Sequence, residues 1–428
     1  MDQRKTIYLC ALVTAVCMAF LMHYLLFIWR SYLSQTPGHP PIYGDFFALW
    51  SYAQLTNDHP MVELYDYGLT HARQIALGMD PGEKYPFPYP QMFAFMVWPL
   101  CLVQYEMGYL LLMLGSLALF MWVVWTTCSR QPFCLFGLII SPATMATIFA
   151  GQTGFLAAAL MTAGIRLAGS RPVVAGVLFG VLSYKPQLGL LVPVALIAAR
   201  LWVALGAACV TVAGLAAAAT LAFGWHVWRA WLAMMPAYSE WFDSVQVVWP
   251  IRPTVTANLQ MLGVALPWAR GIQLVVAGLV AIVVWNCFRR NAGPLSAAAL
   301  LVGSALAAPH AFFYDLPIVC AGMVLLIEDR TRPGQSFSTT EVLSLLLAMM
   351  FPALMVLPET QFPISTIALS LLLFVIVRRQ GEAKAQRDQD ETERVEAEVV
   401  GDRDKPGHDT GEGGHDTAGV AMTRGWLR

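Results

Sequence analysis

The run MGYLLLMLGSLALFMWVVWTTC, residues 107–128, is the clearest indication of the fold class. It carries no charged side chain and is long enough to cross a bilayer as an α-helix, which needs about 20 apolar residues. A helix also satisfies its own backbone hydrogen bonds, as a chain surrounded by lipid must. The run therefore predicts a transmembrane helix.

Similar apolar runs lie on both sides of this one. The chain of 428 residues is 57% hydrophobic and only 12% charged, whereas a soluble domain carries about 25% charged residues. We therefore predict an all-α polytopic membrane protein with about 12 transmembrane helices and further helices on the outer membrane surface. The predicted spans are 6–29, 107–128, 133–149, 152–168, 172–184, 187–199, 201–223, 268–288, 294–308, 316–328, 341–357 and 362–378.

Positive residues orient these spans, because Lys and Arg collect on the cytoplasmic side of a membrane protein. With a cytoplasmic N-terminus, the arginines near alternate turns all fall on that side. They are Arg130, Arg166, Arg171, Arg200, Arg289, Arg290, Arg330, Arg332, Arg378 and Arg379. The pattern predicts a protein of the bacterial inner membrane with both termini in the cytoplasm. It places the loops 30–106 and 224–267 outside, with the short apolar segment 91–103 lying along the outer surface.

The composition changes after Arg379. Residues 380–428 are highly charged and poor in large apolar side chains, so they bury too little surface to offset the entropy of ordering. The sequence thus predicts a membrane domain at 1–379 and a disordered cytoplasmic tail at 380–428. The eight cysteines lie in or beside apolar segments without metal-ligand spacing, and we expect no disulfide framework, no bound metal and no cofactor.

Polar residues at membrane depth or just outside it mark candidate chemistry, and the predicted topology puts four groups of them on the outer side. Asp45 lies among aromatic residues in the stretch 43–50. It either acts as a general base or caps a short helix. Tyr89 lies near the end of the proline-rich turn 84–91, which stiffens the chain and could also position a substrate.

Lys185 interrupts two apolar runs within the stretch 183–187. It either pairs with a phosphate or extends its amine to the membrane interface. His310 and Asp315 lie in the turn 309–316. There the histidine either donates to a phosphate or makes an ordinary structural hydrogen bond, and the aspartate orients it or caps the next helix. The tryptophans of the loop 224–267 indicate either an interfacial belt or stacking against sugar rings or prenyl chains.

Several short motifs lie in and between these groups. They are Gly44-Asp45-Phe46 with Trp50, Tyr65-Asp66, Pro86-Phe87 with Tyr89-Pro90, Trp98-Pro99-Leu100, Gly151-Gln152, Arg171-Pro172 leading to Tyr184-Lys185-Pro186-Gln187, and Pro309-His310 with Tyr314-Asp315. The order and spacing of these motifs resemble the polyprenyl-phosphate-mannose-dependent mannosyltransferases of glycosyltransferase family 87, which have the GT-C membrane fold. The similarity runs through about residues 40–330. It implies a lipid-linked sugar donor, inversion at the anomeric carbon and a catalytic aspartate at Asp45.

The resulting hypothesis is an integral-membrane inverting hexosyltransferase. It would move a sugar, mannose by the resemblance, from a polyprenyl-phosphate carrier to a glycolipid or glycan acceptor on the periplasmic face. Asp45 would accept the proton of the acceptor hydroxyl. Lys185, His310 and Arg252 would act as cations toward the donor phosphate. The residues expected to position the substrates are Tyr89, Gln152, Gln187, Tyr314 and Asp315.

Two other classes of protein are alternatives to this hypothesis. A secondary transporter or lipid flippase would also have helices broken at polar residues, although no internal repeat relates the two halves of the chain. A non-catalytic assembly scaffold would leave the acidic, aromatic first loop unexplained. No Walker loop, HExxH or GxSxG motif occurs in a usable context, which weighs against an ATP-driven pump and a soluble-type hydrolase. The net charge of −1 gives no nucleic-acid footprint.

Overall fold

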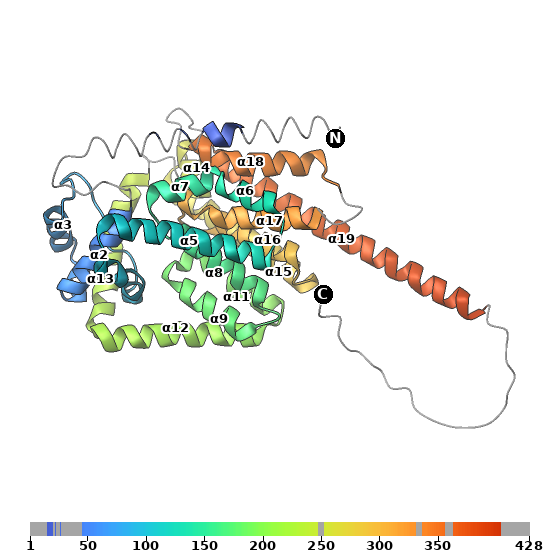
Figure 1. Cartoon of the computed structure of the whole chain (residues 1–428), viewed down its shortest axis with the longest axis horizontal. Helices are drawn as coiled ribbons and strands as arrows, with labels where there is room; N and C mark the ends of the chain where they lie inside the picture. The colour runs from blue at the N-terminus through green and yellow to red at the C-terminus, as the bar shows by residue number, and fades with distance from the viewer. Residues whose placement is uncertain are drawn as a thin grey trace, which may run out of the picture. The chain divides into compact units, whose positions relative to one another are not determined.

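The computed structural model describes residues 15–19, 22, 26, 45–246, 252–330, 336–355 and 363–403. Within these residues all regular structure is helical and no strand occurs, which confirms the all-α class (Figure 1). Of the predicted first span, 6–29, only 15–19, 22 and 26 are described, and they are helical. The rest of that span and residues 404–428 lie outside the described residues.

Four described helices are long and apolar enough to cross a membrane: α5 (Tyr105–Thr127), α12 (Trp202–Phe223), α15 (Leu266–Arg290) and the part Ile364–Ala385 of α19 (Ile364–Arg403). A fifth candidate is the pair α6 (Pro132–Ile139) and α7 (Pro142–Ala150), which bends by 47° at its break. Their composition makes this a membrane protein. The larger number of spans and the GT-C type of the fold stay predictions.

Shorter apolar helices lie where the sequence predicts the other spans. They are α8 (Gly154–Leu167), α9 (Pro172–Val181), α10 (Pro186–Gly189), α11 (Val192–Ala198), α16 (Pro294–Ala307), α17 (Pro317–Arg330) and α18 (Thr339–Met355). Many of them begin with proline, whose missing N–H costs nothing in the first turn and whose fixed φ suits a helix. The same residue prevents the preceding residue from continuing a helix, so the apolar runs break where prolines occur.

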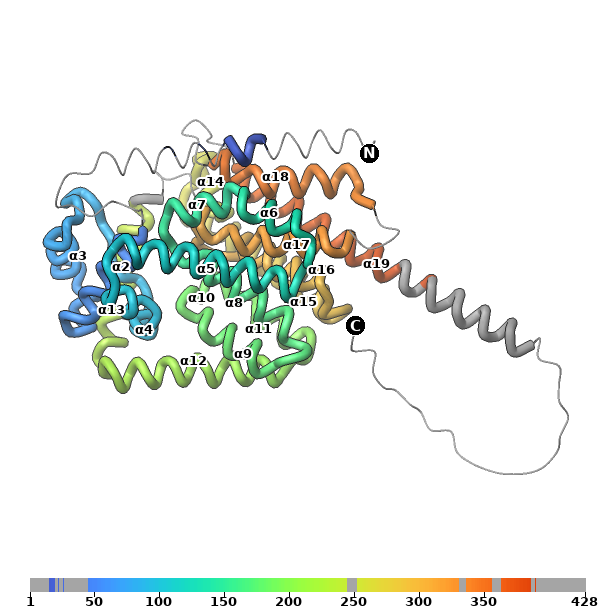
Figure 2. Tube along the Cα trace, viewed as in Figure 1, coloured from blue at the N-terminus to red at the C-terminus, as the bar shows by residue number. Residues whose placement is uncertain are grey.

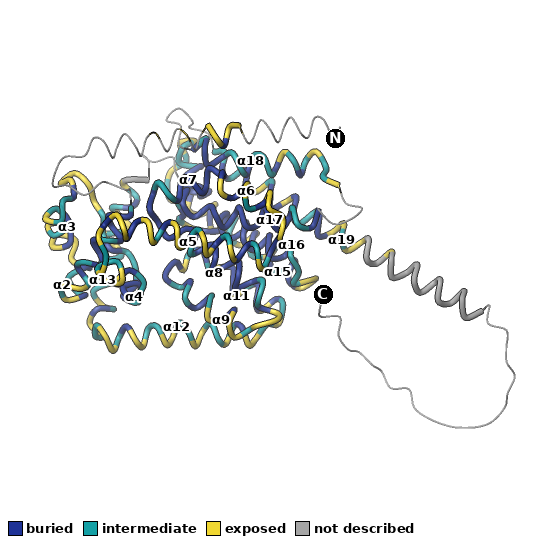
Figure 3. The backbone as a smooth tube through the Cα atoms, in the orientation of Figure 1, coloured by how far each residue is buried: buried dark blue, intermediate teal, exposed yellow. Residues whose placement is uncertain are grey.

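Helices α8, α16 and α17 contribute the longest buried stretches to the hydrophobic core. Every residue of α16 from Leu295 to Ala307 is buried, and so is every residue of α17 from Pro317 to Leu326. Small side chains dominate α16 and allow helix backbones to approach closely. Figure 3 shows these helices as buried, whereas α12 is mostly exposed along its length and faces the surroundings of the protein.

The two long predicted outer loops also fold as helices. The first forms α2 (Phe46–Asp58), η1 (Met61–Tyr65) and α3 (Tyr67–Ala76), and the second forms α13 (His226–Gln246) and α14 (Val255–Met261). The predicted surface segment 91–103 folds as three short pieces, η2 (Gln91–Phe93), α4 (Ala94–Val97) and η3 (Trp98–Leu102). Figure 2 shows α2, α3, α4 and α13 gathered at one end of the helices.

Buried ion pairs join the last helices of the membrane domain. Arg330 at the end of α17 pairs with Glu341 of α18, and the Arg379 Nε atom of α19 lies 2.7 Å from Asp329 Oδ2. These arginines were predicted to face the cytoplasm, and the structure gives two of them carboxylate partners. A buried charge is stable only when it is paired, so these contacts hold α17, α18 and α19 together.

The chain divides into two compact units, Met1–Gln380 and Gly381–Arg428. Helix α19 crosses this division and continues to Arg403, although the sequence predicts disorder from residue 380. The residues between Arg379 and Arg403 are rich in Glu, Ala, Gln and Arg, which have high helix propensity and form favourable pairs three or four residues apart. The lack of large apolar residues after position 379 argues against a packed domain there, but it does not prevent the segment from forming a helix.

Candidate active site

Asp45 immediately precedes α2, and its side chain turns away from that helix. The residue occupies the N-cap position, yet its carboxylate makes no capping hydrogen bond. Instead, Gln152 Nε2 donates to Asp45 Oδ2 at 3.4 Å. The structure therefore does not support the helix-cap interpretation of Asp45, because the carboxylate is directed toward groups from distant parts of the chain.

Gln152 is placed by the sharp end of α7. Gly151 has φ 67°, the left-handed conformation that glycine adopts without a steric penalty, and it ends that helix. The Gln152 Oε1 atom accepts a hydrogen bond from the backbone N–H of Thr153 at 3.1 Å, which orients the amide. Its amide nitrogen therefore faces Asp45, and its side chain also interacts with the Tyr89 hydroxyl. Gln152 thus links two predicted site residues.

Lys185 and Asp315 form a buried ion pair. Lys185 Nζ lies 2.6 Å from Asp315 Oδ1, and the two side chains are only 3% and 4% exposed. The second carboxylate oxygen, Oδ2, accepts from the backbone N–H of Phe312 at 3.1 Å. The Lys185 amine also lies 5.0 Å from the centre of the Tyr314 ring. Lys185 therefore does not extend its amine to the membrane interface, and a carboxylate already compensates its charge.

A close backbone approach holds the turn 309–316 against the start of α8. A Cβ atom on Gly154 would lie 1.8 Å from the carbonyl oxygen of Tyr314, so only glycine fits there. The same carbonyl accepts from the Thr147 hydroxyl at 3.1 Å. These contacts place Tyr314 and Asp315 beside Gln152, which immediately precedes Thr153 and α8.

Arg252 is a buried cation without a hydrogen-bonding partner for two of its nitrogens. Its side chain is 3% exposed, and Nε and Nη1 have no partner among the described residues. The guanidinium Cζ lies 3.9 Å from the Phe242 ring centre and 4.9 Å from the Phe312 ring centre. Burial lowers the pKa of Arg252 to about 10, so it stays protonated at neutral pH.

His310 lies beside the same aromatic group. Its ring centre is 5.7 Å from that of Phe242. Burial lowers the pKa of His310, and the nearby charges of Arg252 and Lys185 lower it further against the opposing effect of Asp315. The sequence hypothesis treated His310 as a cation. The lowered pKa favours the neutral imidazole, which can donate a hydrogen bond without adding charge.

The electrostatic setting of Asp45 suits a base. Burial raises the pKa of the Asp45 carboxyl to about 6, although Gln152, Lys185 and Tyr314 favour the ionised form. At neutral pH the group is therefore mostly ionised, yet it binds a proton more strongly than a solvated aspartate does. A carboxylate with these properties can accept a proton from a hydroxyl that becomes acidic during a reaction.

The proline-rich turn offers backbone carbonyls that aromatic side chains satisfy. The Tyr52 hydroxyl donates to Pro86 at 2.7 Å, the Tyr65 hydroxyl donates to Tyr89 at 2.9 Å, and the Trp231 indole donates to Pro88 at 3.1 Å. Because prolines lack an N–H, the turn depends on such donors from outside. These contacts hold Tyr89 in place between α2 and α13.

The structure brings together Asp45, Tyr89, Gln152, Lys185, Tyr314 and Asp315 through the hydrogen bonds and charge interactions described above, with His310 and Arg252 beside them. Gln187 differs. It is half-buried in α10, and within the described part of the chain no hydrogen bond joins it to the other candidates.

Sequence reasoning missed two residues of α13. The Tyr238 phenol interacts with both Asp45 and Arg252, and burial raises its pKa to about 12, so it remains a neutral donor. Phe242 lies one helical turn later and contacts Arg252. The tryptophans drew attention to this segment, but nothing in the sequence distinguished Tyr238 and Phe242 from other aromatic residues on an amphipathic helix.

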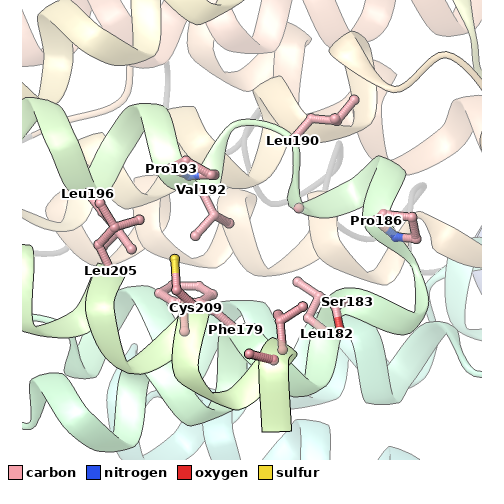
Figure 4. A pocket seen from close by; sticks show the side chains of 14 residues that line it. Phe179, Leu182, Ser183, Pro186, Leu190, Val192, Pro193, Leu196, Leu205 and Cys209 are labelled. Atoms are coloured by element: carbon pink, nitrogen blue, oxygen red, sulfur yellow. The ribbon is translucent and has the colours of Figure 1, made fainter. Parts of the chain in front are cut away.

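An apolar cavity of about 540 Å³ lies next to the segment 183–186, between α9, α10, α11 and α12 (Figure 4). Ser183 and Pro186, which flank the Lys185–Tyr184 pair, belong to its wall, and the wall continues to Leu196 and Leu205. Cys209 also lines it and is exposed. The cavity is of the size of common ligand pockets, about 300–1,000 Å³.

The comparisons with known proteins give one match. The model of glycosyltransferase family 87 matches residues 87–309, just over half of the chain. Tyr89, Gln152, Lys185 and Arg252 lie within the matched range, whereas Asp45 and the residues from His310 to Asp315 lie outside it. No curated protein and no solved structure matches the chain. Among the described residues, no group of three or more His, Cys, Asp or Glu side chains could hold a metal ion.

Proposed function

Because the chain belongs to glycosyltransferase family 87 and is a membrane glycosyltransferase, we propose that it transfers one hexose from a polyprenyl-phosphate carrier to a hydroxyl of a glycolipid or glycan. Mannose is the sugar that the family resemblance favours. The reaction inverts the anomeric carbon and takes place on the periplasmic face of a bacterial inner membrane, with both termini in the cytoplasm.

One observation carries the proposal. A carboxylate with a raised pKa, Asp45, shares a buried site with the Lys185–Asp315 pair and the Gln152 amide. These groups come from four segments that are far apart in the sequence. A structural ion pair would need only Lys185 and Asp315, whereas a second, unpaired carboxylate beside them is expected where a proton must be accepted.

In the proposed step, the acceptor hydroxyl gives its proton to the Asp45 carboxylate. The oxygen lone pair then forms a bond to the anomeric carbon from the face opposite the phosphate. The bond between that carbon and the phosphate oxygen breaks, and its electron pair stays on the phosphate. A single base suffices, because the polyprenyl phosphate is a good leaving group and needs no acid. The products are a glycosylated acceptor and polyprenyl phosphate.

The phosphate gains negative charge as it leaves, and the basic side of the site would stabilise it. Arg252 and Lys185 supply positive charge, and His310 supplies a neutral hydrogen-bond donor. Tyr89, Gln152, Tyr314 and Asp315 position these groups. Gln187 remains a proposed positioning residue without a supporting contact. With these donors the reaction requires no divalent metal ion or other cofactor.

The apolar cavity next to the segment 183–186 suits the prenyl chain of the carrier. Its wall is almost entirely hydrocarbon, and it begins at Ser183 and Pro186 beside the polar site. It then continues to Leu196 near the end of α11 and Leu205 near the start of α12. The exposed side chain of Cys209 supports an opening toward lipid on the α12 side.

Asp45→Asn tests the base role. Purified protein in lipid would be assayed with a radiolabelled polyprenyl-phosphate sugar and a glycolipid acceptor. The amide cannot accept the proton, so transfer should fall about 100-fold or more. Asp66→Asn is the matched control, because Asp66 caps α3 through the Leu69 N–H and lies outside the site. It should retain wild-type transfer.

Transfer by Asp45→Asn within about threefold of wild type would remove Asp45 from the base role, since positioned bases contribute about 100-fold or more. A wild-type protein that forms no labelled glycolipid but accumulates a solute in vesicles would instead be a transporter. In that outcome the site would serve translocation and not sugar transfer.

A further inference from the structure

Arg252 differs from every other buried basic residue that the structure describes. The described basic residues that are buried are Lys185, Arg252, Arg330 and Arg379. Lys185, Arg330 and Arg379 each have a carboxylate partner. No salt bridge joins Arg252 to a carboxylate in the described part of the chain, and its Nε and Nη1 atoms are unpartnered. A buried, unpaired guanidinium is costly unless an anion binds there.

Phenylalanine rings take the place of a carboxylate at Arg252. The Phe242 and Phe312 ring centres are 6.0 Å apart, and the planes are nearly perpendicular, at 88°. The guanidinium lies against both rings, within the distance of about 6 Å at which aromatic faces attract a cation. This attraction offsets part of the desolvation cost. It uses none of the N–H donors, so the guanidinium keeps both its charge and its hydrogen-bonding capacity.

The charges of the site explain why such a cation matters. Lys185 and Asp315 compensate each other at 2.6 Å, and ionised Asp45 then leaves one net negative charge. A lipid phosphate would be repelled by that charge. Arg252 balances Asp45, and Arg270 balances Asp243, the carboxylate whose charge also acts on Arg252. The site with Arg252 is therefore neutral before the donor binds and can accept an anion.

Both phenylalanines are held by other contacts. Phe242 belongs to α13, which is joined to α15 through Arg270 Nη2 and Asp243 Oδ1 at 2.5 Å and to the proline-rich turn through Trp231. The backbone N–H of Phe312 binds Asp315 Oδ2 at 3.1 Å. Phe312 therefore contacts one basic group through its ring and holds the partner of the other through its backbone.

We propose that Phe242 and Phe312 are positioning residues that keep Arg252 free of carboxylates as the main binding group for the phosphate of the lipid carrier. The proposal rests on the proposed function, because it assumes a phosphate-linked lipid as the donor. Lys185 then acts chiefly through its ion pair with Asp315, and this pair orients the site. Its part in binding the phosphate is smaller than the sequence hypothesis assigned to it.

The test measures binding of polyprenyl phosphate to purified protein, with uncharged polyprenol as the comparison ligand. Phe242→Leu keeps an apolar side chain but removes the aromatic face. It should weaken binding of polyprenyl phosphate about tenfold, as expected for a desolvated cation–aromatic contact, and leave polyprenol binding unchanged. In an Arg252→Ala background, Phe242→Leu should have no further effect, because the interaction that it removes is absent.

Phe223→Leu is the matched control. Its ring stacks on Phe95 at 5.5 Å at the end of α12, and its loss should change the binding of neither ligand. An equal loss of polyprenol and polyprenyl phosphate binding in Phe242→Leu would make Phe242 a packing residue and overturn the proposal. The same tenfold loss in the Arg252→Ala background would also overturn it. If phosphatidylglycerol competed for the site as well as polyprenyl phosphate does, the proposal that the site binds the lipid carrier would be overturned.

These results separate the inference from the proposed function. Binding that depends on Phe242, Arg252 and the phosphate group would support the inference even in a protein that transferred no sugar. Transfer that is lost in Asp45→Asn, with binding of polyprenyl phosphate unchanged in Phe242→Leu, would support the function and reject the inference.

Discussion

Replacing Gly189 with leucine would fill part of the apolar cavity without disturbing the polar site. Gly189 lines the cavity, and a Cβ atom built on it meets no atom within 4 Å. Leucine also has a higher helix propensity than glycine, so the variant should fold. The four carbons of its side chain would occupy room that the proposed prenyl chain needs.

The size of the effect follows from the hydrocarbon displaced. Each methylene group removed from an apolar environment costs about 0.8 kcal/mol, so four displaced groups cost up to about 3 kcal/mol. Since about 1.4 kcal/mol corresponds to a factor of ten, the KM for a long-chain polyprenyl-phosphate sugar should rise between about tenfold and 100-fold. The kcat should change little, because the reacting groups are untouched.

The assay compares a long-chain donor with a donor whose prenyl chain is too short to enter the cavity. Gly189→Leu should impair use of the first and spare the second. Gly206→Leu is the matched control: this glycine of α12 also has open space around its Cβ position, but it does not line the cavity. A long-chain KM within about twofold of wild type in a folded Gly189→Leu protein would refute the assignment of the cavity. An equal loss for both donors would also refute it.

Further outcomes follow from the site. Because burial raises the pKa of Asp45 to about 6 and its ionised form is the base, kcat/KM should fall about tenfold per pH unit below that value. Gln152→Leu removes a group that lowers this pKa, so the acid limb of the pH–rate profile should move to higher pH, and an unmoved limb would argue against Asp45 as the titrating base. Gly154→Ala should lower Tm and transfer together, because its Cβ would overlap the Tyr314 carbonyl; wild-type stability would contradict this. Lys185→Ala should destabilise the fold by about 3–5 kcal/mol, measured by denaturant unfolding, since it leaves Asp315 buried and unpaired.

The positions of the apolar helices could be predicted from the sequence, because they depend on local properties of the chain. The length and composition of runs such as 107–128 correspond to α5 within a few residues. Prolines such as Pro172 and Pro294 mark where helices begin. The charge pattern also put four polar groups on one side of the membrane, and the structure brings the main members of those groups together. The side itself remains a prediction.

Which residues pair within the site could not be predicted from the sequence, because the pairs join residues that are far apart in the chain. Lys185 and Asp315 are 130 positions apart, and Gln152 and Asp45 are 107 positions apart. From the sequence, Lys185 was a free cation, and only the fold showed that a carboxylate already compensates it. His310 was predicted to be charged, and its burial lowers its pKa and so favours the neutral imidazole.

Apolar length, proline and charge act locally, so the amino-acid sequence was sufficient to predict the membrane class, the positions of most apolar helices and the residue types from which a transferase site can be built. Which charges are paired and which are not, and the contact of Phe242 in α13 with Arg252, became apparent only from the folded chain. Pairing and burial depend on the distances between distant segments, and those distances arise only when α8, α16 and α17 pack into one core. The pKa of Asp45 and the unpaired state of Arg252 are therefore properties of the fold.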